Sequence, residues 1–129
     1  MLFVCKQQIR GNLEQSCPAW NGALTKINIK ELESIQRSAV NIILCYMSIS
    51  YRKSLNFLKI QSLEERRKRL CTKFAIKCAK SSKFKPWFRK TVRVTRTHPS
   101  YIRPKSRTAY YEKSPLIYLT KLLTEENKI

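Results

Sequence analysis

A chain of 129 residues has room for one domain at most, and 43% hydrophobic residues are enough for a core. Lys and Arg number 27 against eight acids, which gives a formal net charge of +19 and makes a polyanion the expected partner, nucleic acid before an anionic membrane. Only two Gly and five Pro occur, a composition that favours helices over a many-turned β architecture.

The titratable residues argue against catalysis. All eight acids are Glu, and the single His is His98. Two-metal phosphoryl chemistry needs converging carboxylates, and no Glu pair lies in a strand-like or Gly-flanked setting. A Cys–His pair would have to use His98, in a polar stretch beside Pro99. We therefore expect no enzymatic activity, no cofactor and no small-molecule substrate.

The five Cys show no CxxC spacing, so no zinc site is expected. Cys71 and Cys78 are seven residues apart, on one face of a helix, and the general expectation is buried, reduced thiols. Together with the lack of a signal peptide, this predicts an intracellular protein, nuclear or cytoplasmic and not secreted. No apolar stretch is long enough for a transmembrane segment.

The first half of the chain predicts several helices. Residues 2–16 suit a weak helix that Gly11 interrupts and that begins as though an upstream segment were missing. Residues 17–22 suit a turn with Trp20 as a core anchor. The best helix covers 28–46, with a capping box of Asn28 and Glu31. Its apolar stripe comprises Leu32, Ile35, Ala39, Ile42, Ile43 and Tyr46.

Two more helices follow. Ser50 caps a short one in which Tyr51, Leu55 and Leu58 align. Ser62 and Glu65 form a capping box for a helix that runs to about Lys80. Its expected buried stripe comprises Leu63, Leu70, Cys71, Phe74 and Cys78. Arg67 falls within that stripe, where an unpaired guanidinium is costly, so we expect it to meet Glu33 or Glu64 or to escape past the helix end.

Basic residues cluster on the 62–80 helix and in the segment that follows. At 100° per residue, Arg66, Arg69, Lys73, Lys77 and Lys80 fall within an arc of about 80°. A solvated face is the alternative to a phosphate-binding row, but few acids interrupt it. The predicted contacts continue through Lys83, Lys85, Arg89, Lys90, Arg93, Arg96, Arg103, Lys105 and Arg107.

Residues 89–113 lack helical or alternating periodicity and suit an extended or disordered basic arm. Tyr101 and Tyr110 are candidates for stacking on unpaired bases. Trp87 is a further one, although we expect Phe84, Trp87 and Phe88 to pin the arm to the helices instead.

Ser114 and Pro115 then start a short helix whose leucines recur at helical spacing. The fold class predicted is all-α. A small bundle of about four helices covers 1–88; the basic arm covers 89–113; the short C-terminal helix and tail cover 114–129.

Several segments resemble a known family in order and spacing. They are LEQSCPAW at 13–20, LESIQRSA at 32–39, SLEERRKRLC at 62–71, FKPWF at 84–88 and SPLIYLT at 114–120. Together they resemble the region after the catalytic core in jockey-type non-LTR retrotransposon reverse transcriptases, over residues 9–124. The resemblance implies a thumb-like helical region that supports the template–primer duplex. The palm motif with its paired catalytic Asp has no counterpart here, so polymerase activity is not implied.

The sequence thus predicts a nucleic-acid-binding C-terminal fragment of such an enzyme. Its expected partners are the RNA or DNA backbone and, second, the polymerase portion of a parent reverse transcriptase. Three alternatives stay open: a translated relic without a selected role, an interaction module that docks through the Leu-rich 115–123 helix, and a protein of anionic membrane surfaces.

Overall fold

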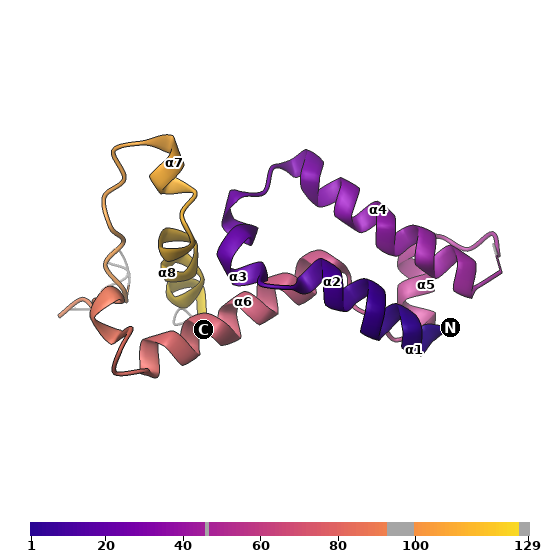
Figure 1. The fold of residues 1–129 in the computed structure, drawn as a ribbon, viewed down its shortest axis with the longest axis horizontal. Coiled ribbons are helices and arrows are strands. Elements are labelled where there is room, and N and C mark those ends of the chain that lie inside the picture. The colour runs from indigo at the N-terminus through magenta and orange to yellow at the C-terminus, as the bar shows by residue number, and fades with distance from the viewer. Residues whose placement is uncertain (46, 93–99, 127–129) are drawn as a thin grey trace. The chain divides into compact units, whose positions relative to one another are not determined.

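The computed structural model describes residues 1–45, 47–92 and 100–126, and in this part of the chain the fold is all-α (Figure 1). The extended pairing found there is an isolated antiparallel bridge between Lys90 and Tyr101. The helical elements, with η for 3-10 and π segments, are α1 (Leu2–Val4), η1 (Cys5–Ile9), α2 (Arg10–Glu14), α3 (Cys17–Trp20), η2 (Asn21–Ala23), α4 (Lys26–Ile43), α5 (Tyr51–Phe57), α6 (Leu63–Lys80), η3 (Lys85–Trp87), α7 (Ala109–Glu112) and α8 (Pro115–Glu126).

The chain divides into two compact units. Unit 1 comprises residues 1–17 and 24–68, and unit 2 comprises residues 18–23 and 69–129. The dividing points do not coincide with the boundaries expected at residues 88 and 113. One of them lies inside α6, whose first turns belong to unit 1 and whose remainder belongs to unit 2.

Unit 1 begins with a continuous helical stretch formed by α1, η1 and α2. Its middle part, Cys5–Ile9, is a π-helical segment. Gly11 lies inside α2 and does not interrupt it, contrary to the expected break. The stretch ends before Gln15, whose ψ of 127° leaves the helical region, and Ser16 follows with a φ of 52°.

Helix α4 starts and packs differently from the prediction. Thr25 is the N-cap and forms a capping box with Asn28, so the predicted box of Asn28 and Glu31 is wrong. Ile35 and Ile42 are exposed although both were expected in the apolar stripe. Tyr46, the last residue of that stripe, lies outside the described residues. The buried face of α4 instead comprises Gln36, Ala39 and Val40.

The short helix α5 and the start of α6 lie where they were predicted. Ser50 directly precedes α5, but its side chain forms no capping hydrogen bond, so the predicted cap is wrong. Tyr51 and Leu58 are partly buried and Leu55 is buried, as their alignment predicted. At the start of α6, the backbone N–H of Glu65 donates to Oγ of Ser62 at 3.3 Å, which is one half of the predicted capping box.

A buried polar network explains why Gln36 faces the core of unit 1. Nε of Arg10 donates to Oε1 of Gln36 at 2.9 Å, and Nε2 of Gln36 donates to the Tyr51 hydroxyl at 2.9 Å. Tyr51 in turn donates to Glu33 at 2.5 Å, and Glu33 also accepts from the backbone N–H of Leu63 at 3.1 Å. Because α2, α4, α5 and the start of α6 each contribute to it, the network fixes these elements together.

Arg67 is buried on α6, with 1% of its surface exposed. The predicted escape past the helix end is therefore wrong. Meeting Glu33 or Glu64 stays a prediction.

Unit 2 combines the second part of α6 with η2, η3, α7 and α8. Its core includes Cys71, Ala75 and Cys78 from α6. Phe74 is exposed, so its expected place in the buried stripe is wrong. Helix α8 begins at Pro115 as predicted, and it buries Ile117, Leu119, Thr120, Leu122 and Leu123.

The segment at residues 18–23 is held against α8. Nδ2 of Asn21 donates to the hydroxyl of Tyr118 at 2.7 Å. Gly22 is needed at this approach, since a Cβ placed there would lie 2.6 Å from Cβ of Tyr118. Trp20, the expected core anchor, is partly buried.

Four of the five thiols are buried as predicted, those of Cys5, Cys17, Cys71 and Cys78. Cys45 is exposed and follows Leu44, the C-cap of α4, with a φ of 49°. All five lie in the described part of the chain, and none of them forms a disulfide there.

Candidate nucleic-acid interface

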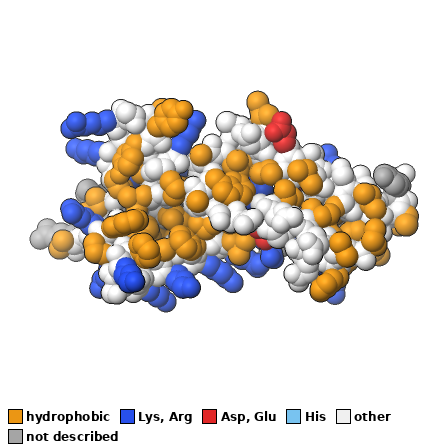
Figure 2. Space-filling model, viewed as in Figure 1, with side chains coloured by type: hydrophobic (Ala, Val, Ile, Leu, Met, Phe, Trp, Pro, Cys, Tyr) orange, Lys and Arg blue, Asp and Glu red, His pale blue; other side chains and the backbone are white. Residues whose placement is uncertain are grey.

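One face of α6 carries the predicted row of cations. Arg69, Lys73, Lys77 and Lys80 are all exposed on this continuous helix, and in unit 2 they lie opposite the buried residues Cys71 and Cys78. In the sequence no acid occurs between Glu65 and Glu112, so after Glu65 helix α6 itself contributes no carboxylate to this face. Figure 2 shows Lys and Arg side chains gathered along the edge of unit 2 that α6 forms.

Arg66, the first predicted member of the row, has a different role. Its Nε lies 2.5 Å from Oε1 of Glu14 within unit 1, and Glu14 is nearly buried. This ion pair offsets the charge of Arg66, so we exclude it from the candidate interface.

A pocket of about 770 Å³ opens in unit 2 where α6 gives way to η3. Four of the predicted nucleic-acid contacts line it, namely Lys80, Lys85, Arg89 and Lys90. They come from the last turn of α6, from η3 and from the start of the arm. The remaining lining residues are Ile76, Ala79, Phe88, Tyr101, Leu123 and Glu126.

Backbone pairing holds the cations of the arm at this pocket. The carbonyl of Arg89 accepts from the N–H of Ile102 at 2.8 Å, and the N–H of Thr91 donates to the carbonyl of Ser100 at 3.1 Å. Nζ of Lys90 lies 5.8 Å from the ring centroid of Tyr101, within the range of a cation–π contact. The start of the arm is therefore a fixed part of unit 2.

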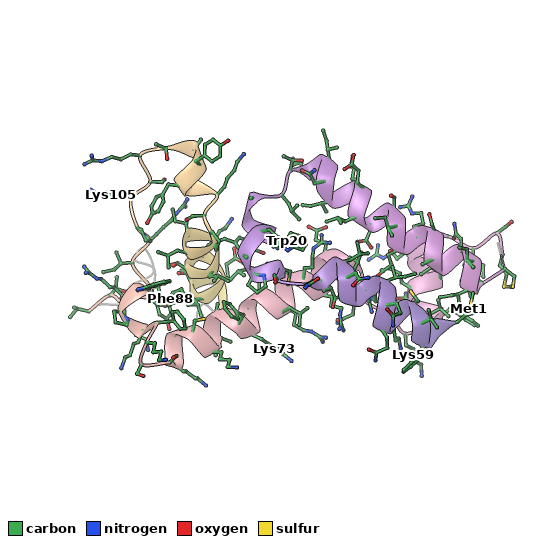
Figure 3. All side chains as sticks on the ribbon, viewed as in Figure 1. Met1, Trp20, Lys59, Lys73, Phe88 and Lys105 are labelled. Atoms are coloured by element: carbon green, nitrogen blue, oxygen red, sulfur yellow. The ribbon has the colours of Figure 1, made fainter. Side chains whose placement is uncertain are left out.

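The aromatic residues differ from the prediction in which are buried and which are exposed. Tyr101 is only 7% exposed and lines the pocket, so it is not an open platform on the surface, and its stacking on a base stays a prediction. Phe88 is buried and pins the arm as predicted, at the corner labelled in Figure 3. Phe84 and Trp87 do not pin it, because Trp87 is 59% exposed and meets Phe84 edge to face at 5.4 Å. Tyr110 is 94% exposed and stays a stacking candidate.

The other predicted cations are less concentrated. Lys83, Lys105 and Arg107 are exposed, and Figure 3 shows Lys105 projecting away from the arm. Nη2 of Arg103 forms an exposed ion pair with Glu112 at 3.2 Å. Arg93 and Arg96 lie outside the described residues.

Sequence reasoning missed the residues that complete the pocket. Ile76 and Ala79 lie on α6 between the predicted cations. Neither belongs to the apolar stripe expected for this helix, so the sequence pattern did not indicate a role for them. Leu123 and Glu126 come from α8, more than thirty residues along the chain from Arg89. No local sequence pattern indicates that these elements share a cavity.

The described part of the chain holds no group of three or more His, Cys, Asp or Glu side chains placed to bind a metal ion. None of its helices is long and apolar enough to cross a bilayer. Compared with known proteins, this chain matches no family model, no curated protein and no solved structure.

Proposed function

We propose that the basic face of unit 2 binds the phosphate backbone of RNA or DNA with little dependence on base sequence. The observation that carries the proposal is the convergence of Lys80, Lys85, Arg89 and Lys90 on one open pocket, with further exposed cations along α6. Cations that reach phosphates release condensed counterions, which drives binding without reading bases.

The dimensions of α6 fit this role. From Arg69 to Lys80 the helix rises by about 16 Å at 1.5 Å per residue. A nucleic-acid strand carries about five phosphates over that length, at roughly 3.4 Å per charge along the axis. Four cations occupy this length of the helix face, so the charges of protein and strand are well matched.

The test is the salt dependence of binding, measured by fluorescence anisotropy with labelled single-stranded RNA, single-stranded DNA and duplex DNA. If six to ten phosphates are contacted, the affinity falls by about 10³–10⁵ between 50 and 200 mM salt. Replacing Lys80, Lys85, Arg89 and Lys90 by Gln together lowers the slope of log affinity against log salt by about three units, at roughly 0.7–0.9 per phosphate contact.

A matched variant distinguishes the effect of this site on binding from the effect of the overall charge. Changing Lys26, Lys30, Arg52 and Lys53 to Gln removes the same number of exposed charges from unit 1. We expect this variant to keep the wild-type slope. Equal effects of the two variants, or no binding at low salt, contradict the proposal. Flotation with anionic liposomes tests the membrane-surface alternative in parallel.

The interaction-module alternative depended on an apolar C-terminal helix free to dock. Helix α8 instead buries Ile117, Leu119, Leu122 and Leu123 inside unit 2. The same side chains cannot also serve a partner without opening the unit. We therefore favour binding through the basic face, without catalysis, since the sequence lacks Asp and has one His.

The proposed origin is the post-polymerase region of a non-LTR retrotransposon reverse transcriptase, and it rests on the sequence resemblance alone. A decayed polymerase reading frame directly upstream in the genome supports this origin, and unrelated intact sequence there contradicts it. Peptides detected by mass spectrometry in cell extracts would show that the chain is made, and their absence favours a relic without a role.

A further inference from the structure

The pocket of unit 2 is more than a row of positive charges. Besides its four cations, it is lined by the apolar or aromatic residues Ile76, Ala79, Phe88, Tyr101 and Leu123. Its volume of about 770 Å³ lies in the range of roughly 300–1,000 Å³ typical of small-molecule sites. Backbone binding alone uses the cations and leaves the apolar surface without a ligand.

We propose that this pocket receives one unpaired nucleotide of a single-stranded RNA or DNA. The phosphate lies against the cations, and the base lies against the apolar lining. This inference rests on the proposed nucleic-acid binding of unit 2 and adds to it a preference for single strands. In a duplex the base is paired and stacked, and extruding it costs a few kcal/mol, so a duplex gains nothing from the pocket.

Glu126 determines which end of the nucleotide lies at which side of the pocket. It is the one acid among the described residues that line the pocket, and a carboxylate repels a phosphate. The phosphate end therefore faces Lys85, Arg89 and Lys90, and the base edge faces Glu126. An ionised carboxylate only accepts hydrogen bonds, so it favours bases with amino groups over uracil, whose single N–H is flanked by two carbonyls.

The first test fills the pocket without changing any charge. Ala79 lines the pocket and is partly buried on α6, so the Ala79→Phe side chain occupies space that the base would use. We expect the affinity for an adenine-containing single strand to fall about tenfold, in line with the contribution of one stacked base, and the affinity for duplex DNA to stay unchanged. Ala109→Phe, at an exposed alanine of α7 outside the pocket, is the control and is expected to change neither affinity.

Two further measurements keep the inference testable if Ala79→Phe does not fold. With the wild-type chain, 2-aminopurine in a single strand brightens when its base leaves the stack for the pocket, and an unchanged signal overturns the inference. With Glu126→Gln, the preference for oligo(A) over oligo(U) is expected to disappear, since an amide also donates to uracil carbonyls.

The outcomes separate this inference from the proposed function. If Ala79→Phe folds and binds single strands as the wild type does, or loses single strands and duplex equally, the nucleotide pocket is overturned. Backbone binding still stands in that case if the fourfold Gln variant at the pocket lowers the salt slope. If the wild type binds no nucleic acid at low salt, both proposals fail together.

Discussion

Gly22 packs so closely against Tyr118 that any larger residue must displace α8 or the 18–23 segment. We expect Gly22→Ala to lower the free energy of unfolding by about 1–3 kcal/mol, the usual cost of overpacking. Urea unfolding followed by circular dichroism measures the change. Gly11→Ala is the matched control, because a Cβ at Gly11 meets nothing within 4 Å. In a helix it is expected to stabilise by about 0.5–1 kcal/mol, and a loss at Gly11 as large as that at Gly22 contradicts this account.

The cysteines differ in exposure and therefore in reactivity. We expect Cys45 to be alkylated rapidly by iodoacetamide, because it is exposed, while the four buried thiols react only as the protein opens. Burial raises the pKa of Cys78, which further lowers its thiolate fraction near neutral pH. Peptide mass spectrometry after a short pulse resolves the sites. If Cys71 or Cys78 is still labelled rapidly in a Cys45→Ser variant, the burial of these two thiols on α6 is wrong.

Single residues were predictable where the local pattern decides their environment. The exposed cations of α6 followed from helical spacing, and so did the burial of Cys71 and Cys78. Arg66 and Tyr101 were not predictable in this way. Glu14 pairs with Arg66 across 52 positions of sequence, and the bridge to Lys90 buries Tyr101. Both environments depend on contacts that local patterns do not encode.

At the scale of elements, the Tyr51 hydroxyl connects α5 to α4 in the polar network of unit 1. Tyr51→Phe removes its hydrogen bonds to Glu33 and Gln36 and leaves both partners less well satisfied. We expect a loss of about 1–3 kcal/mol in the free energy of unfolding. Tyr110→Phe, at a hydroxyl on an exposed side chain of α7, is expected to change it by less than about 0.5 kcal/mol. Equal effects of the two variants would mean that the hydrogen bonds of Tyr51 contribute nothing to the free energy of unfolding.

The same hydroxyl gives a dependence on pH. Burial, and then the hydrogen bond to Glu33, raises the pKa of Tyr51 above its ordinary value of 10.0. A raised pKa in the folded state favours the neutral phenol, so its contribution is complete below about pH 10 and is lost as the pH rises toward the folded-state pKa. The stability difference between wild type and Tyr51→Phe is therefore expected to stay constant from pH 7 to 9 and to shrink above about pH 10. A difference that grows above pH 10 contradicts the assigned environment.

Element types were easier to predict than their ends and faces. The α4 helix was expected from its periodicity, yet Thr25 caps it three residues before the expected Asn28. Its buried face turned toward Gln36 because Arg10 and Tyr51 supply hydrogen-bonding partners there. A hydrophobic pattern does not encode that preference, and so Ile35 was wrongly expected inside.

For the whole molecule, composition already indicated an all-α fold and a basic surface. The pocket was not predictable, because it forms only where α6, η3, the start of the arm and α8 meet. Its cations were predicted one by one from the sequence. Their convergence, and the apolar residues and Glu126 beside them, needed the tertiary structure.

A net charge of +19 on 129 residues makes repulsion between like charges a cost of the compact state. Salt screens that repulsion, with a Debye length of about 10 Å at 0.1 M. We therefore expect the thermal unfolding midpoint of the free chain to rise between 10 and 300 mM KCl, measured by circular dichroism. The affinity for nucleic acid should fall over the same range, because counterions released from the phosphates gain less entropy in a more concentrated salt solution. The fourfold Gln variant at the pocket carries fewer charges, so both dependences should be weaker in it. A midpoint that falls with salt would mean that attractive ion pairs such as Arg66–Glu14 outweigh the repulsion, and the excess charge would then need no polyanion to offset it.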